Sequence, residues 1–156
     1  MSAIGANFST SISDLTEGKG FGLGDRYVKS DGTEYVFCQA NGAISKNDVV
    51  VFDEAYQADQ ADTTSTAAKV GLLCGVAPYA FADNDYGWIQ VKGPCTVNVG
   101  TSCGTYKTLN STATSGRIDD DATTGAETIL GLVTTGAESS NLAAGMLNYP
   151  AISATL

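Results

Sequence analysis

The sequence contains no histidine. Histidine is the commonest general base and the commonest metal ligand near neutral pH, so its absence removes His-dependent triads and histidine-based metal sites. Carboxylate chemistry and Ser–Lys chemistry stay open. No residue pattern in the chain supplies either, so we predict no catalytic residue, no cofactor-binding residue and no metal ligand, and we interpret the chain as a non-enzyme.

Positive charge is also scarce. Eight basic residues face seventeen acidic ones, and the formal net charge is −9. A phosphate backbone or an anionic membrane surface would be repelled, so nucleic acid and membranes are not expected partners. No apolar run approaches the ~20 residues of a membrane span. The first fifteen residues lack a basic segment followed by an apolar one, so we expect synthesis in the cytoplasm without a signal peptide.

The four cysteines, Cys38, Cys74, Cys95 and Cys103, show no CxxC spacing. Structural zinc sites usually pair their ligands locally, which disfavours a site built from all four. In a reducing compartment free thiols are the default, so we predict buried small residues. A Cys95–Cys103 disulfide across a hairpin is the alternative.

Long helical patterns are missing, and leucine is sparse, while Gly, Ala, Ser and Thr are abundant. Short strands separated by glycine turns are the expected result. We predict strands over residues 26–29, 33–40, 48–52, 70–77, 86–92, 95–99, 106–109, 128–134 and 142–147. Asp31-Gly32 is predicted to be a hairpin turn, and the polar segment 57–68 a long loop.

The stretch 82–104 holds the only tryptophan. Residues 86–92 alternate, which places Trp88 on one face of a strand and Ile89 on the other. Gly93-Pro94 is predicted to break this strand before a second, adjacent one.

Residues Gly100–Gly104 match the Gly-x-Ser-x-Gly pattern of a hydrolase nucleophile elbow. That elbow needs a following helix and a base for the serine, and here a strand is expected and no histidine exists. We therefore predict a turn, with a hydrolase that uses Ser102 as the enzymatic alternative. The aspartates of 119–121 and 83–85 offer oxygen ligands for Ca²⁺, but Asp-rich turns also form without metal.

Residues 1–25 have no sustained period and are predicted to form a flexible N-terminal arm, followed by one β-rich domain over 26–156. The predicted fold is all-β: a small barrel or sandwich, β-tulip-like, with an extended N-terminal arm. Five apolar side chains are candidates for contact with a partner protein or a second subunit: Ile4, Phe8, Leu15, Phe21 and Trp88.

The order of several short segments resembles that of head decoration (cement) proteins of tailed bacteriophages, over residues ~24–150. The segments that carry the resemblance are Gly24–Val28, Ser30–Val36, Gln39–Ile44, Asp48–Val50, Gly75–Ala77, Tyr86–Gly93, Gly131–Val133 and Leu147–Pro150.

The resemblance implies a virion structural protein without catalytic residues. Such a protein binds the outer surface of a phage head as a homotrimer, with the major capsid protein and itself as partners. We expect the arm to order only against a neighbour, so that its deletion weakens head binding and leaves the domain folded. The alternative is a carbohydrate- or receptor-binding β module of a phage fibre or cell surface, with Trp88 in a shallow site.

Overall fold

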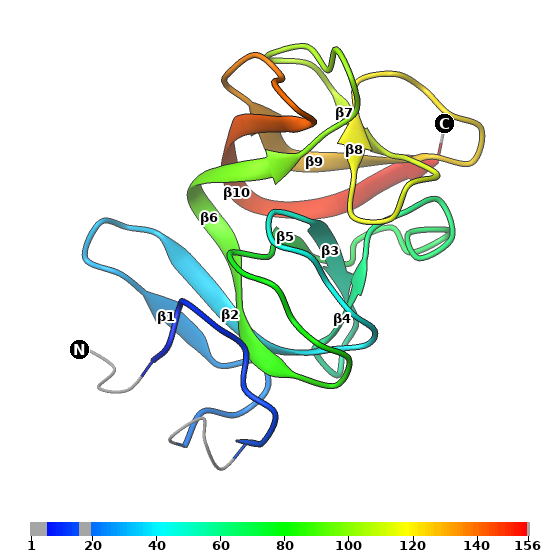
Figure 1. Cartoon of the computed structure of the whole chain (residues 1–156). Coiled ribbons are helices and arrows are strands. Elements are labelled where there is room, and N and C mark those ends of the chain that lie inside the picture. The colour runs from blue at the N-terminus through cyan, green and yellow to red at the C-terminus, as the bar shows by residue number, and fades with distance from the viewer. Residues whose placement is uncertain (1–5, 16–19, 156) are drawn as a thin grey trace.

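The computed structural model describes residues 6–15 and 20–155, in which ten strands and no α-helix are present (Figure 1). The strands are β1 (Arg26–Val28), β2 (Glu34–Ala40), β3 (Val49–Phe52), β4 (Gln57–Gln60), β5 (Cys74–Val76), β6 (Tyr86–Asn98), β7 (Leu109–Ser111), β8 (Ile118–Asp119), β9 (Glu127–Thr134) and β10 (Leu142–Thr155). The predicted all-β class is confirmed. Within these residues there is also no helix long and apolar enough to cross a membrane.

Five strands close into a barrel. They pair in the order β2–β4–β3–β5–β6, and β6 pairs again with β2. Only the β2–β4 contact in this ring is parallel. The predicted hairpin around Asp31-Gly32 is present, since β1 pairs antiparallel with β2 and Tyr27 lies opposite Tyr35. A closed ring leaves no free edge, which suits a small all-β domain.

A second sheet continues from the far half of β6, in the order β6–β10–β9–β7–β8. An isolated parallel bridge between Val99 and Ile118 brings β8 back beside the end of β6. Strand β6 therefore runs through both parts of the molecule (Figure 1). Its first half pairs with β2 as far as Lys92, and its second half pairs with β10 from Lys92 to Asn98.

The prediction of a strand break at Gly93-Pro94 is wrong. Gly93 has a φ of +100° and Pro94 lies opposite Met146, so the strand bends there and changes partner without ending. A glycine tolerates this backbone conformation, and a proline is tolerated where the ladder is irregular. The two runs that were expected to be adjacent strands are two halves of one strand.

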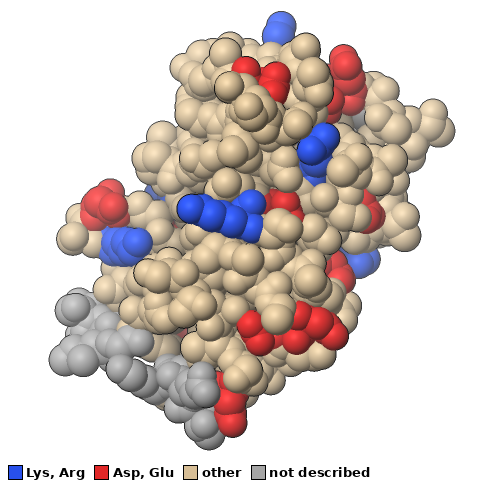
Figure 2. Space-filling view, viewed as in Figure 1, with Lys and Arg blue, Asp and Glu red and all other residues tan. Residues whose placement is uncertain are grey.

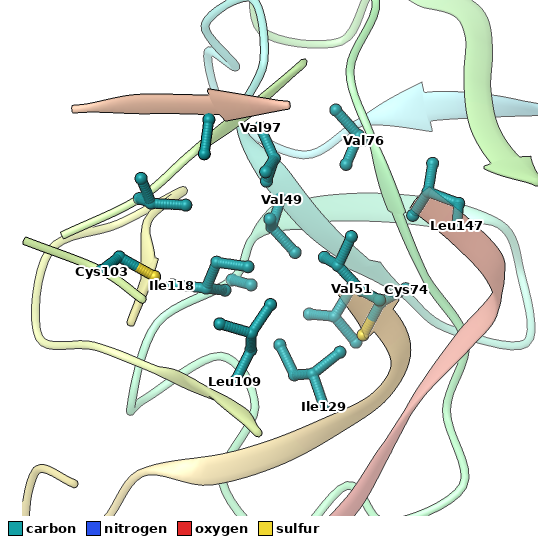
Figure 3. Close-up of a cluster of buried hydrophobic side chains, with 14 of the residues drawn as sticks. Val49, Val51, Cys74, Val76, Val97, Cys103, Leu109, Ile118, Ile129 and Leu147 are labelled. Atoms are coloured by element: carbon teal, nitrogen blue, oxygen red, sulfur yellow. The ribbon is translucent and has the colours of Figure 1, made fainter. Parts of the chain in front are cut away.

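Two apolar cores lie on opposite sides of β3. Val50 and Phe52 point into the barrel, whereas Val49 and Val51 point into the core between the barrel and the second sheet. Figure 3 shows the second core, in which Val49 and Val51 meet side chains such as Ile129. A strand buried on both faces is expected to be apolar throughout, and this explains the apolar sequence of Val49–Phe52.

The observed strands differ from the predictions in several places: the predicted strand 70–77 is reduced to β5 at Cys74–Val76, and β8 was not predicted. Residues 57–60 form β4 inside the predicted loop. The strand was missed because a short polar strand gives no hydrophobic alternation. Strand β7 begins at Leu109, where the predicted strand ended. Strand β10 continues past Leu147 to Thr155, with a register shift between Leu147 and Ala151. An irregularity of that kind hides the continuation of a strand from any periodicity argument.

Candidate assembly surfaces

An aromatic cluster covers the outer face of the barrel where β2 and β6 pair. Trp88 lies at its centre with an exposed fraction of 2%. Phe37 of β2 lies beside it, and two rings of the N-terminal segment, Phe8 and Phe21, cover it. The ring centroids lie 5.1 Å (Phe37), 5.6 Å (Phe8) and 4.9 Å (Phe21) from that of Trp88. Tilted and edge-on rings at such distances form a stable aromatic core.

Backbone hydrogen bonds attach the N-terminal segment to the start of β6. The Ile12 N–H donates to the Tyr86 carbonyl (2.9 Å), and the Tyr86 N–H donates to the Ile12 carbonyl (2.7 Å). The Ser11 hydroxyl donates to the Asp85 carboxylate at 2.5 Å. The Lys29 ammonium lies 4.4 Å from the centroid of the Phe8 ring, a favourable cation–π distance. The N-terminal segment is therefore attached by backbone hydrogen bonds, a side-chain hydrogen bond and a cation–π contact.

The five candidate contact residues differ in where they lie. Trp88 is buried, and Phe8 and Phe21 are partly buried against it. Leu15 is 39% exposed, and Ile4 lies outside the described residues. Contact with a capsid or a second subunit stays a prediction for all five. The division into an arm over 1–25 and a domain over 26–156 also stays a prediction, but the described part of that arm packs on its own chain.

The burial of Trp88 counts against a sugar-binding platform. Stacking on a sugar requires an exposed ring face, and both Phe8 and Phe21 contact this ring. The Trp88 backbone N–H also donates to the Tyr79 hydroxyl inside the protein (2.7 Å). The strand alternation predicted for this residue is confirmed, because Ile89 points into the barrel core and Trp88 points away from it.

A polar junction marks the point at which β6 changes partner. The Lys92 ammonium lies 3.1 Å from one oxygen of Glu34, and the Tyr149 hydroxyl donates to the other. The hydrogen bond from Tyr149 is the main cause that lowers the pKa of Glu34, and Lys92 contributes in the same direction. These contacts join β2, β6 and β10, so the junction holds the barrel and the second sheet in one arrangement.

The Gly-x-Ser-x-Gly segment is a turn, as predicted. Ser102 has a φ of +67°, and its backbone N–H donates to the Glu138 carboxylate at 3.1 Å. The Glu138 carboxylate also accepts a hydrogen bond from the Asn141 N–H, and these backbone contacts lower the pKa of Glu138. No helix follows the serine in the described residues. The geometry is that of a turn held by a carboxylate.

The aspartates after Ile118 serve the same turn. Asp120 accepts a hydrogen bond from the Gly104 N–H (3.0 Å), and Asp119 accepts one from the Asp120 N–H (2.8 Å). Ligand atoms of Cys103, Asp119 and Asp120 lie within 4.8 Å of one another. One oxygen of each carboxylate accepts a backbone hydrogen bond, as is usual in Asp-rich turns.

All four cysteines are free thiols, so the alternative of a Cys95–Cys103 disulfide is wrong. Cys38 lies in the barrel core and Cys74 and Cys103 in the second core, whereas Cys95 is half-buried. The four thiols therefore do not converge on one point. Burial raises the pKa of Cys74 and of Cys95 to about 12, as expected for small apolar core residues.

The outer face formed by the second half of β6, β10 and β9 carries no charged side chain. Residues 93–106, 128–137 and 139–156 contain no Asp, Glu, Lys or Arg. We call the outward side chains of these strands the uncharged face; they are Pro94, Thr96, Leu130, Val133, Leu142, Ala144 and Met146. Registers of the strand pairs place Met146 opposite both Pro94 and Val133, and Ala144 opposite Thr96. Figure 2 shows that, on the side of the molecule in view, acidic and basic side chains are scattered over a mostly uncharged surface.

The fold defines the chain as a small all-β protein built on a closed barrel. No protein-family model matches the sequence, and no curated protein does.

Among solved structures, the chain is similar to one described as the capsid of Myoviridae phage XM1. The superposition covers 82% of this chain and 90% of that one, with a TM-score of 0.54 and 16% sequence identity. At that identity the likeness shows a shared fold.

Proposed function

We propose that this chain is a virion structural protein that decorates the outer surface of a phage head. The observation that carries the proposal is the fold shared with a chain of a phage capsid over nearly the whole of both chains. The order of sequence segments that resembles head decoration proteins supports the same conclusion independently of the fold. The proposed partner is the major capsid protein, and the proposed place is the outside of the head after synthesis in the host cytoplasm.

The proposed assembly is a homotrimer that bridges neighbouring capsid subunits. A cyclic threefold oligomer matches the local symmetry of a shell at its threefold positions. Three linked copies also raise the effective concentration of each binding site, so modest contacts per copy give firm binding. The net charge of −9 keeps separate copies apart by repulsion, which suits a protein that must stay dispersed before it reaches the head. The same charge disfavours binding to the packaged genome.

The direct test is mass spectrometry of purified virions of the phage that encodes the chain, combined with immunogold labelling of intact heads. We expect a copy number comparable with that of the major capsid protein, and label on the outside of the head. Absence from virions, or a few copies confined to a fibre, would contradict the proposal.

A second test uses heads that lack the chain. Purified chain is added back, binding is measured by co-sedimentation, and genome release is measured during heating. We expect saturable binding and a higher temperature of genome release. Leu15→Glu should weaken binding because Leu15 is a 39% exposed contact candidate, whereas Val70→Glu, at a 61% exposed site outside the candidates, is the control. Equal binding by the two variants would remove Leu15 from the contact.

A further inference from the structure

The uncharged face differs from the rest of the surface in its lack of any ionisable side chain. The chain carries 25 charged residues, and none of them lies in the three segments that build this face. The charges at its two ends are already engaged, since Lys92 pairs with Glu34 and Glu138 accepts backbone hydrogen bonds. A surface that is depleted of charge at its centre and bordered by polar groups is typical of a protein–protein interface.

Apolar side chains occupy this face at positions where a solvent-exposed sheet normally carries polar ones. Leu130 is 57% exposed, Met146 is 42% exposed and Leu142 is 37% exposed. Each of them has a strand neighbour that points into the second core: Ile129 beside Leu130, Leu147 beside Met146, and Ala143 beside Leu142. The alternation is thus regular, but both faces of the sheet are apolar, as in a sheet covered on both sides.

The charge of the whole molecule indicates what covers the face. Two copies at −9 each repel one another wherever their carboxylates meet. On the uncharged face two copies approach without bringing carboxylates together and without burying an unpaired charge. Around a threefold axis, each copy turns this face toward its two neighbours, so copies meet over uncharged surface and no carboxylates are brought together.

We propose that copies of this chain meet one another through the uncharged face of β6, β10 and β9. This inference deepens the proposed function, since it rests on the oligomer proposed there and names the surface that forms it. The contact is made by side chains of a sheet face and needs no free strand edge. Its rigidity comes from the second core directly beneath it, so substitutions at the outward positions leave that core intact.

The test is sedimentation equilibrium of the full-length chain and of single charge substitutions. Met146→Lys on β10 and Leu130→Lys on β9 each place a charge at the proposed contact. Because the burial of an unpaired charge is strongly unfavourable, we expect self-association to weaken by at least ~100-fold in both variants. Val70→Lys is the matched control, since it adds the same charge at a site that is 61% exposed and lies outside the face. It should associate like the unsubstituted chain.

Salt provides a second readout that needs no substitution. Screening lengths fall to about 10 Å at 0.1 M salt, which reduces repulsion between acidic copies. An apolar contact between such copies is therefore maintained or strengthened as salt rises. A contact formed by ion pairs would weaken instead, and that result would overturn the proposal.

The outcomes separate this inference from the proposed function. An unsubstituted chain that is a monomer both in solution and on heads overturns the inference and leaves head decoration intact. Oligomers that survive both Met146→Lys and Leu130→Lys also overturn it. If the two variants become folded monomers by near-ultraviolet circular dichroism while the unsubstituted chain never binds heads, the inference stands and head decoration fails.

Discussion

The barrel and the second sheet share strand β6, and each has an apolar outer face beside it, but the two faces are covered differently. On the barrel, Phe8 and Phe21 of the same chain cover Trp88. On the second sheet, Met146 and Leu130 stay exposed, and no described segment of the chain covers them. The difference teaches that one apolar face is satisfied within the chain, whereas the other stays exposed and is the face at which we propose that copies meet.

The largest effect is expected where the chain covers its own face. Trp88→Ala removes the centre of the aromatic cluster and leaves a cavity between β2, β6 and the N-terminal segment. We expect a loss of about 3–5 kcal/mol in the free energy of unfolding, measured by urea denaturation. Tyr106→Ala is the control, because Tyr106 is 72% exposed and its loss should change stability by less than about 0.5 kcal/mol. A similar loss in the two variants would mean that the cluster does not stabilise the barrel.

The second largest effect is expected where the two parts are joined. The Asp48 carboxylate is buried and accepts hydrogen bonds from the Gln60 amide (2.5 Å), the Asn98 amide (3.1 Å) and the Ser45 N–H (2.8 Å). Asp48→Ala leaves these donors without their acceptor, and we expect a loss of roughly 2–4 kcal/mol by the same denaturation assay. Asp121→Ala, at an exposed position, should have little effect. A neutral result for Asp48→Ala would show that water replaces the carboxylate.

A smaller effect on stability is expected from the rings of the N-terminal segment that cover Trp88. Phe8 is only partly buried, so Phe8→Ala should reduce the free energy of unfolding by about 1–2 kcal/mol. The same change uncovers Trp88, which is the only tryptophan, so its emission should shift to longer wavelength and acrylamide should quench it more strongly. Leu23→Ala, at a 36% exposed site nearby, is the control. Unchanged fluorescence in Phe8→Ala would show that this ring does not cover Trp88 in solution.

The smallest effect concerns pH at the polar junction. The pKa of Glu34 is lowered in the folded chain from its usual 4.5, chiefly by the Tyr149 hydroxyl. A carboxylate with a depressed folded pKa stabilises the fold above its unfolded pKa, and this contribution is lost as pH falls through the folded value. We therefore expect the melting temperature to fall on acidification below about pH 4.5. The fall should be less steep in Glu34→Gln, and exposed Glu54→Gln is the control for the change of charge alone. An identical pH dependence in Glu34→Gln and the unsubstituted chain would exclude the junction as its cause.

Much of the fold could be predicted from residue patterns. Alternation placed Trp88 and Ile89 on opposite faces, and a strand was predicted over residues 48–52, where β3 lies. These predictions work because side-chain direction along a strand is fixed by the pleat. They fail at Gly93-Pro94, where residue types typical of a turn instead let a strand bend and change partner.

The surfaces were harder to predict. Phe8 and Phe21 were expected to contact another protein, but nothing in their local sequence shows that Trp88, far along the chain, lies within reach. The uncharged face left a clear signal in the sequence, since residues 139–156 contain no charge at all. That signal acquires meaning only when the registers place β10 between β6 and β9, with the apolar side chains of all three on one side.

Strand β6 has a mechanical consequence. Its thirteen residues have a contour length of roughly 40 Å at ~3.3 Å per residue, and they connect the aromatic cluster to the uncharged face. Tension applied between these two surfaces runs along one covalent backbone, with β2 hydrogen-bonded to its first half and β10 to its second. A load that passes from β2 through β6 to β10 separates the two parts only when one of these ladders shears along its length, which resists force far better than peeling one strand from an edge.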